Sequence, residues 1–323
     1  MTATWTVLVA DSIAIDGLAP LASDPRFALV VRPGLAGDDL ASAIADADAV
    51  LVRSATKITR ASLSKAERLK AIGRAGVGVD TIDVDAASER NIPVLTAPAG
   101  NTISAAELTM ALLLALARKV PAADRSMKAG EWDRKSFNGF ELYGKTLGLV
   151  GAGRIGGQVA KRARAFGMQV VVYDPWLGQE RARELDVQLG TLDVVLKSAD
   201  VISVHVPLTD VTAGLIGPAQ FAMMKAGGLL LNVARGGVVD EKALLAALTS
   251  GHLGGAALDV YEAEPLPKDS PLRALPNVVM TPHLGASTAE AQQNVAIEIA
   301  EAVRNCLSDG DLTNAVNAAR IRR

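Results

Sequence analysis

The sequence predicts an α/β fold made of two doubly wound domains, each built around a parallel sheet. Short apolar runs rich in β-branched residues alternate along the chain with alanine-rich segments of helical period, which is the pattern of parallel α/β layers. The runs form two successive groups, and only the second group begins with a glycine fingerprint, at residues 151–156. A helical segment at 289–307 follows the second group, and we expect it to return to the first domain.

The predicted strands are short runs separated by helical segments and by turn-forming residues. The first group comprises Thr6–Ala10, Phe27–Val31, Ala49–Val52, Lys70–Gly73 and Pro93–Thr96. The second group comprises Thr146–Val150, Gln169–Tyr173, Val201–Val204, Gly228–Val233, Gly255–Leu258 and Asn277–Thr281. No repeat of fixed period links the two groups, so we infer two separate sheets rather than a repeat array.

The second group opens with a G-x-G-x-x-G motif directly after a predicted strand. Gly151 lets the chain turn tightly, Gly153 lets the backbone approach a pyrophosphate, and Gly156 lets a helix pack closely on the sheet. Because helix N-termini bind phosphates, the motif predicts a dinucleotide site of the Rossmann type. The predicted cofactor contacts are Gly151, Gly153, Arg154, Ile155, Gly156, Asp174, His205, Pro207, Thr209, Ala234 and Asp259.

Asp174 selects between the two nicotinamide cofactors. It directly follows the second strand of the group, where an acid binds the adenosine ribose hydroxyls. A 2′-phosphate about 4 Å from this carboxylate would be repelled by roughly 4 kcal/mol per unit charge at an effective dielectric of 20. The residues that follow are Pro175-Trp176-Leu177, with no arginine to hold such a phosphate, so we predict NAD rather than NADP.

The segment between the two groups is predicted to be a joint followed by a helix. Ala97–Asn101 is interpreted as the joint, and Ser104-Ala105-Ala106-Glu107 as a capping box that starts the helix. The helix is apolar nearly all round as far as Lys119, so it must be buried, either by its own domain or by a second subunit. We expect a homodimer formed through the 104–134 region, with a tetramer as a further possibility.

These elements predict the domain organisation. Residues 1–98 and 289–323 are expected to form a substrate-binding domain of flavodoxin-like fold. Residues 99–288 are expected to form the Rossmann NAD-binding domain, inserted into the first domain with a cleft beside it. The chain then passes between the two domains twice. Proteins with two such connections can close on a ligand by hinge motion.

Composition narrows the function classes. The net charge is −2 with acids and bases interspersed, which argues against a nucleic-acid or membrane partner and favours a small-molecule substrate. Cys306 is the only cysteine and no basic segment precedes the first apolar run, so we expect no signal peptide and a cytoplasmic location. The apolar block 108–117 is shorter than the ~20 residues of a membrane span. No metal site is predicted.

Candidate catalytic residues follow the strands of the second group. His283 stands after Val279-Met280-Thr281-Pro282, and Arg235 stands after a strand and before two glycines that give access to it. An arginine in that place suits a bidentate grip on a carboxylate. His205 also ends a strand, but a cofactor-edge or structural role is favoured, and His252 lies in a predicted surface turn. Glu264 precedes Pro265, and the residue alone leaves a catalytic and a solvated role open.

Three motifs together resemble the signatures of the D-2-hydroxyacid dehydrogenase family. They are Asn232-Val233-Ala234-Arg235-Gly236, Ala257-Leu258-Asp259-Val260-Tyr261 with Glu264-Pro265, and Thr281-Pro282-His283-Leu284-Gly285. The resemblance covers essentially the whole chain. It implies that Arg235 binds the substrate carboxylate and carbonyl oxygen, that His283 exchanges the hydroxyl proton, and that Glu264 hydrogen-bonds the histidine.

Further stretches resemble family members whose substrate is a phosphorylated 2-hydroxy acid. They are residues 52–59, residues 73–80, Asn101 and Trp132-Asp133-Arg134-Lys135. A substrate with a carboxylate at one end and a phosphate at the other requires a second cluster of donors besides Arg235. The resemblance implies that this cluster comprises Arg53, Ser54, Arg74, Gly76, Asn101 and Arg134, with Gly76 acting through its backbone.

Many of these members carry a C-terminal regulatory extension. The chain ends at Arg323, so regulation through such an extension is not expected. Two alternatives stay open at this point. One is a different 2-hydroxyacid enzyme, such as a glyoxylate or hydroxypyruvate reductase, which needs no phosphate site. The other is an NAD-sensing scaffold like the transcriptional corepressors that share this fold.

Overall fold

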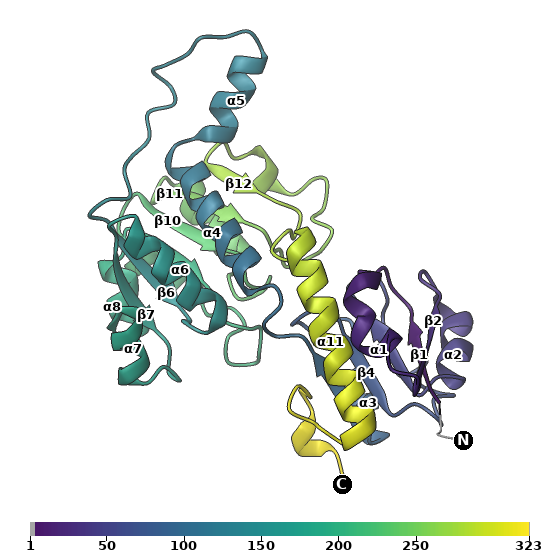
Figure 1. Ribbon diagram of the computed structural model, residues 1–323. Helices are drawn as coiled ribbons and strands as arrows, with labels where there is room; N and C mark the ends of the chain where they lie inside the picture. The colour runs from purple at the N-terminus through teal and green to yellow at the C-terminus, as the bar shows by residue number, and fades with distance from the viewer. Residues whose placement is uncertain (1–3, 323) are drawn as a thin grey trace. The chain divides into compact units, whose positions relative to one another are not determined.

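The computed structural model describes residues 4–322, which divide into two compact units (Figure 1). One unit comprises Met1–Thr102 and Ala286–Arg323, and the other comprises Ile103–Gly285. The second unit is thus an insertion in the first, and its bounds lie a few residues from the expected 99 and 288. None of the helices within residues 4–322 combines the length and the apolar content that crossing a bilayer would require.

The first unit contains a parallel sheet with the strand order β2-β1-β3-β4-β5. This is the flavodoxin-like order, in which the chain starts near the middle and winds outward in both directions. The strands are β1 (Trp5–Val9), β2 (Phe27–Val31), β3 (Ala49–Val52), β4 (Ala71–Arg74) and β5 (Val94–Thr96). Their bounds differ by at most one residue from the expected runs.

Helices cover both faces of this sheet. One face buries Leu40 and Ile44 of α2 (Gly37–Ala45) and Ala86 of α3 (Val84–Glu89). The other face buries Leu21 of α1 (Ala19–Ala22) and Ile299 of α11 (Ala289–Asp309). Helix α11 thus packs on the sheet of the first unit, as expected for the helical segment 289–307. Two short 3₁₀ helices, Ile15–Leu18 and Ala318–Arg320, complete the unit.

The second unit contains a seven-stranded parallel sheet in the order β12-β11-β10-β9-β6-β7-β8. The chain runs outward from β6 to β8 and then crosses back to β9, which makes the Rossmann switch point between β6 and β9. The strands are β6 (Thr146–Val150), β7 (Gln169–Tyr173), β8 (Gln188–Leu189), β9 (Val201–Val204), β10 (Gly228–Asn232), β11 (Leu253–Leu258) and β12 (Val278–Met280). Strand β8 was not predicted, because two residues carry no periodic signal.

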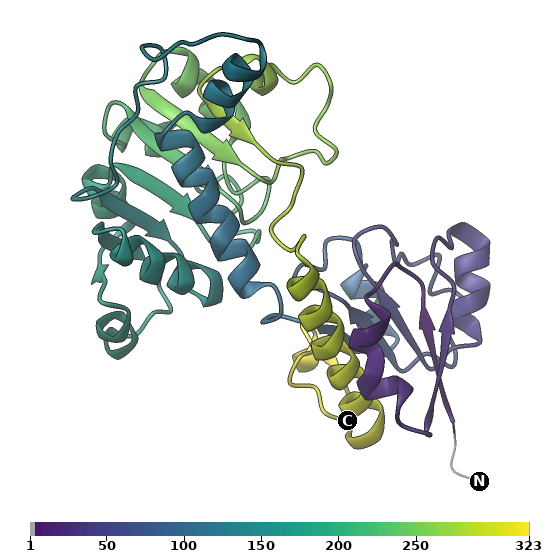
Figure 2. The ribbon, with the colours of Figure 1, turned by 45° about the horizontal axis from the view of Figure 1, so that its top comes forward.

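Two layers of helices sandwich this sheet. On one face α4 (Thr102–Ala117) and α6 (Arg154–Ala165) pack on β6 and its neighbours, and Figure 2 shows α4 lying along the sheet. On the other face lie α8 (Leu192–Ser198), α9 (Pro218–Met223) and α10 (Glu241–Thr249). The remaining helices are α7 (Gln179–Leu185), which follows β7, and the 3₁₀ helix Pro271–Ala274.

The predicted capping box at Ser104 is wrong. Helix α4 begins at Thr102, so Ser104 lies inside its first turn. The residues just before helix α4 are anchored by a contact that is distant in sequence. The Glu298 carboxylate on α11 accepts hydrogen bonds from the N–H groups of Ala99 (3.0 Å) and Gly100 (2.8 Å). A local motif could not reveal this anchor, because it comes from the other end of the chain.

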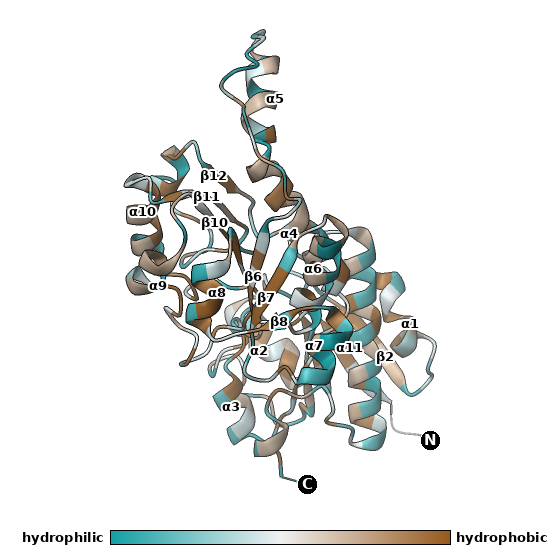
Figure 3. Ribbon diagram, turned by 90° about the vertical axis from the view of Figure 1, so that its left-hand side faces the viewer, coloured by the Kyte–Doolittle hydropathy of each residue, from teal (hydrophilic) through white to brown (hydrophobic). Residues whose placement is uncertain are grey.

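The apolar helix α4 is buried mainly by its own unit. Leu113 and Leu116 join the core formed with Leu147 and Leu149 of β6. The following helix α5 (Val120–Lys128) differs, because none of its residues is buried. Figure 3 shows α5 standing apart from the sheet of its unit, with apolar residues among polar ones. The apolar surface left over in this region therefore belongs to α5 and the segment after it.

Candidate active site

The glycine fingerprint adopts the geometry that a dinucleotide pyrophosphate requires. Gly151 has φ +96°, and a Cβ on it would lie 3.0 Å from the His205 carbonyl oxygen. A Cβ on Gly156 would lie 2.3 Å from the Gly151 carbonyl oxygen, so only glycine lets α6 pack there. Gly153 faces open space and caps α6 without a side-chain cap. The first-turn N–H groups of α6 are therefore open to phosphate oxygens, and the loop fits NAD.

Asp174 lies directly beside this loop. Its Oδ2 accepts a hydrogen bond from the Ala152 N–H at 2.8 Å, and its Oδ1 accepts one from the Trp176 N–H at 2.9 Å. A carboxylate oxygen can accept more than one hydrogen bond, so both oxygens keep capacity for ribose hydroxyls. Asp174 thus also holds the fingerprint loop in place, a role that the sequence analysis missed.

His205 packs against the glycine fingerprint. It follows β9, its Cβ lies 3.4 Å from where a Cβ on Gly156 would be, and its Nε2 contacts the Ser203 Oγ at 2.9 Å. Burial lowers the pKa of His205 to about 4, so the ring is neutral at physiological pH. A neutral ring next to the phosphate-binding loop is consistent with a packing role rather than proton transfer. The exposed loop that follows it carries Pro207 and Thr209.

Arg235 is positioned by a network at the end of β10. The Asn232 side chain accepts a hydrogen bond from the Ala234 N–H (3.1 Å) and donates one to the Arg235 carbonyl (2.9 Å), which shapes the turn. The Arg235 guanidinium donates to the Ala234 carbonyl at 2.7 Å. Gly236 follows at once, and a Cβ there would lie 1.8 Å from the Tyr261 carbonyl oxygen. The loop after β10 therefore lies directly against the loop after β11.

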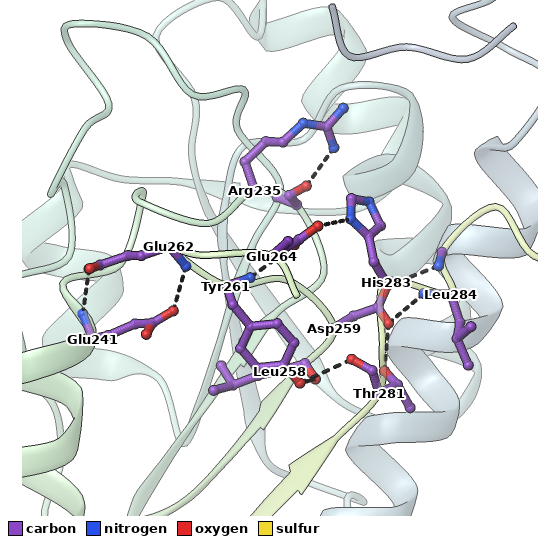
Figure 4. Close-up of polar contacts among 12 residues, drawn as sticks. Arg235, Glu241, Leu258, Asp259, Tyr261, Glu262, Glu264, Thr281, His283 and Leu284 are labelled. Carbon is purple, nitrogen blue, oxygen red and sulfur yellow. Dashed lines mark hydrogen bonds and ion pairs between the residues drawn. The ribbon is translucent and has the colours of Figure 1, made fainter. Parts of the chain in front are cut away.

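Glu264 and His283 form a hydrogen-bonded pair. His283 Nδ1 lies 2.7 Å from Glu264 Oε2, and the other carboxylate oxygen accepts from the Tyr261 N–H at 3.1 Å (Figure 4). When Nδ1–H donates to the carboxylate, the second ring nitrogen of His283 carries the lone pair that can take a proton. Both side chains are partly exposed, 47% for His283 and 36% for Glu264, so a substrate can reach them.

The three residues of this predicted triad come from three neighbouring strands. Arg235 follows β10, Glu264 follows β11 and His283 follows β12, and these strands are adjacent in the sheet. Because all three strands are parallel, their carboxyl ends lie at one edge, where ligands bind in open α/β sheets. Figure 4 shows the three side chains gathered at this edge.

Asp259 is the buried anchor of the histidine loop. Its side chain is fully buried and accepts hydrogen bonds from Thr281 Oγ1 (2.6 Å), Leu284 N (2.7 Å) and Gly285 N (2.9 Å). Its backbone carbonyl accepts from the His283 N–H at 2.8 Å. His283 is held with φ +57°, an uncommon conformation for a side chain of this size. The sequence predicts Asp259 only as a cofactor contact, and this anchoring role was not predicted.

The predicted substrate residues of the first unit lie at strand ends. Arg53 and Ser54 follow β3, while Arg74 ends the neighbouring strand β4 and Gly76 follows with φ +145°. The Arg53 guanidinium donates to the Ser12 carbonyl at 3.1 Å, and that of Arg74 to the Ala75 carbonyl at 2.9 Å.

Asp11 shapes the loop after β3, and this role was not predicted from the sequence. It is buried, and its Oδ2 accepts from the N–H groups of Arg53, Ala55 and Thr56. Asn101 also belongs to the first unit and has a buried side-chain oxygen, whereas Arg134 is exposed in the second unit after α5. A buried aspartate after the first strand could have signalled the anchor.

Comparison with known proteins establishes the family. The sequence profile described as "D-isomer specific 2-hydroxyacid dehydrogenase, NAD binding domain" matches residues 110–285. The chain belongs to the D-isomer specific 2-hydroxyacid dehydrogenase family, and NAD is the cofactor of its Rossmann domain. The triad and the fingerprint lie within the matched residues.

A relative from Methanocaldococcus jannaschii, "D-3-phosphoglycerate dehydrogenase", is 53% identical over 90% of this chain and 56% of its own length. The chain spans between 56% and 60% of the length of the first curated relatives that it matches. Among solved structures, a glyoxylate reductase from Paecilomyes thermophila is 30% identical with a TM-score of 0.87, over 98% of this chain and 99% of that one. The NAD⁺-bound 3-phosphoglycerate dehydrogenase of Entamoeba histolytica is 28% identical with a TM-score of 0.82, over 98% and 99%.

Proposed function

We propose that this protein is an NAD-dependent D-3-phosphoglycerate dehydrogenase. It would oxidise D-3-phosphoglycerate to 3-phosphohydroxypyruvate, the first step of serine biosynthesis. The observation that carries the proposal is the hydrogen-bonded pair of His283 and Glu264, which lies beside Arg235 at the edge of an NAD-binding sheet. The 53% identity to a relative of that name supports the choice of substrate.

In the proposed mechanism the three side chains divide the work on the substrate. NAD, when bound, supplies the acceptor for the hydride that leaves C2. His283 accepts the C2 hydroxyl proton at its free ring nitrogen, and Glu264 stabilises the imidazolium that forms, as a carboxylate does in a His–Asp pair. Arg235 binds the substrate carboxylate and the developing carbonyl oxygen. The cofactor would be held by the fingerprint, by Asp174 and by the predicted contacts His205, Pro207, Thr209, Ala234 and Asp259.

The phosphate and the remainder of the substrate are assigned to the second set of predicted residues. Arg53 and Ser54 follow one strand of the first sheet and Arg74 and Gly76 its neighbour, which supports a common role. Asn101 and Arg134 complete the set, and each contributes a donor of the kind that a phosphate requires. A cytoplasmic location fits this metabolic role, and it is supported by the single cysteine.

Initial rates of NAD reduction across 3-phosphoglycerate, glycerate, lactate and 2-hydroxyglutarate test the proposal. We expect the largest kcat/KM with 3-phosphoglycerate. Because a hydrogen bond to a charged group contributes ~1.5–3 kcal/mol, Arg134→Ala should lower this value roughly 10- to 100-fold and change the value for glycerate much less. Lys135→Ala, at the exposed neighbouring position, is the control.

Two other outcomes would redirect the assignment. If glycerate or another short acid turns over faster than 3-phosphoglycerate, and Arg134→Ala changes nothing, the enzyme is a reductase of short 2-hydroxy acids. The structural likeness to a glyoxylate reductase favours this second candidate. If no acid supports NAD reduction, a scaffold function replaces the enzymatic one.

We also propose that the protein assembles as a homodimer through α5 and the segment after it. No residue of α5 is buried, and Val120, Met127 and Trp132 are 53%, 52% and 77% exposed. Exposed apolar groups that cluster on one projecting segment are typical of an interface, and tryptophan is a common centre of one. Helix α4, the other part of the 104–134 region, packs largely within its own unit. A tetramer would need a further surface.

Replacing Met127 and Trp132 together with glutamate should reduce the mass in solution to that of one chain, 33.5 kDa. Light scattering coupled to size exclusion measures this mass. Val194→Glu places the same change at a 51% exposed position on α8 and should leave the mass unaltered. A double variant that keeps the wild-type mass, or a wild-type protein that is already monomeric, would contradict the proposed interface.

A further inference from the structure

Two glutamates outside the triad exchange hydrogen bonds between the loops that carry it. The Glu241 N–H donates to Glu262 Oε1 at 3.0 Å, and the Glu262 N–H donates to Glu241 Oε1 at 2.6 Å (Figure 4). Glu241 is the first residue of α10, and Glu262 lies two residues before Glu264. The pair forms a closed ring of two backbone donors and two side-chain acceptors, which we name the glutamate clasp.

The clasp joins the segment that follows Arg235 to the segment that carries Glu264. Two further contacts lie on either side of it. Gly236 is so close to Tyr261 that a Cβ would lie 1.8 Å from the Tyr261 carbonyl oxygen, and the Tyr261 N–H donates to Glu264 at 3.1 Å. The segment from Tyr261 to Glu264 is therefore tied to the start of α10 at Glu262, and its two ends are joined by the Tyr261–Glu264 bond.

The chemistry of the clasp depends on its hydrogen bonds and not on charge. Burial raises the pKa of Glu241, and the carboxylates of Glu262 and Glu264 add to the rise, while the Glu262 N–H bond opposes it. Two carboxylates side by side repel each other, so ion pairing cannot be what holds them. A neutral carboxyl or an amide keeps a carbonyl oxygen that accepts the same N–H. Glutamine should therefore replace either glutamate, whereas alanine removes the acceptor.

We propose that Glu241 and Glu262 are positioning residues of the active site, which hold Glu264 at the distance from His283 that the reaction requires. The expected change in kcat rests on the proposed function. The geometric part concerns the order of the segment 261–264 and stands by itself. A helix N-terminus that merely receives a capping carboxylate would need Glu262 alone, but here the helix residue returns the bond to the loop.

The test compares Glu241→Ala/Glu262→Ala with Glu241→Gln/Glu262→Gln in the full chain. The alanine pair should lower kcat with the best substrate of the wild type about tenfold, within the ~10²-fold that a misplacement of 1 Å can cost. The dissociation constant of NAD should stay within about twofold, because most of the predicted cofactor contacts, in the fingerprint, at Asp174 and after β9, lie on other strands. The glutamine pair should recover most of the lost rate. Asp193→Ala, an exposed acid in the first turn of α8, is the matched control.

Hydrogen–deuterium exchange gives a readout that needs no activity. Amides in peptides covering 258–266 should exchange faster in the alanine pair and at the wild-type rate in the glutamine pair. If the double alanine variant does not fold, the single variants Glu241→Ala and Glu262→Ala are compared with the glutamine pair in its place. A lower melting temperature with unchanged kcat, or unchanged exchange in 258–266, would overturn the proposal. Absence of turnover in the wild type would instead refute the proposed function. Hydrogen–deuterium exchange would then still show whether the clasp orders the segment 258–266.

Discussion

Replacing His283 is expected to lower the turnover number for NAD reduction at least ~100-fold, because general base catalysis is typically worth 10²–10⁴ in rate. His283 is the only member of the triad with a free ring nitrogen that can accept the hydroxyl proton while its Nδ1 is engaged by Glu264. NAD affinity should persist, since His283 is not among the predicted cofactor contacts and the fingerprint lies between β6 and α6. Stopped-flow and steady-state rates of NADH formation, with NAD binding followed by fluorescence, measure both quantities.

The choice of substitution follows from the backbone. His283 has φ +57°, and an alanine held in this left-handed conformation would be strained by roughly 1–2 kcal/mol. Asparagine tolerates the conformation better, so His283→Asn separates loss of the base from loss of loop geometry. His252→Ala serves as the control, because the His252 ring contacts the Phe221 carbonyl (2.8 Å) and lies outside the triad. A loss below tenfold in His283→Asn would remove His283 from the role of base.

Replacing Asp174 with alanine is expected to weaken NAD binding roughly 10- to 100-fold, because hydrogen bonds to a charged group contribute ~1.5–3 kcal/mol each. The same change removes the repulsion of a 2′-phosphate, about 4 kcal/mol per unit charge at 4 Å and an effective dielectric of 20. The preference for NAD over NADP should therefore fall by at least about 30-fold. Dissociation constants of NAD and NADP, measured by titration of the same preparation, give this ratio directly.

The structure makes Asp174→Asn the more informative companion variant. Alanine also deprives the Ala152 N–H of its acceptor, so part of any loss would come from a disordered fingerprint loop. Asparagine keeps one oxygen for that N–H and loses the charge. If the asparagine variant gains NADP use while its melting temperature stays near the wild-type value, the ribose assignment is supported. An unchanged cofactor preference in both variants would refute it.

Most of the fold could be predicted because its signals are local. The strand runs of both sheets lie within two residues of the bounds that their apolar pattern indicates, and some, such as Phe27–Val31 and Gln169–Tyr173, match them. Strand β8 and the start of α4 were not predicted correctly. The strand has only two residues, and the segment just before the helix is anchored by Glu298, which binds the N–H groups of Ala99 and Gly100. Such a contact joins positions about two hundred residues apart, which no window of sequence contains.

The functional residues divide in the same way. Arg235, Glu264 and His283 could be proposed from the sequence because each stands next to a strand end with a family signature around it. The anchoring role of Asp259 and the roles of Glu241 and Glu262 could not be predicted, because they depend on the backbone donors that these side chains bind. Asp259, for example, accepts from Thr281, Leu284 and Gly285, which approach it only when β11 and β12 pair.

The sequence by itself determined the class of fold and the cofactor, and it predicted three candidates for the reacting side chains. Glycine spacing, an acid after the second strand and strand-end motifs act through local geometry, so they can be recognised without coordinates. Only the tertiary structure decided how those side chains are held. It showed the contact of His283 with Glu264, the buried carboxylate of Asp259 under the histidine loop and the clasp of Glu241 and Glu262. These depend on which strands become neighbours, and that is settled by the packing of the whole sheet.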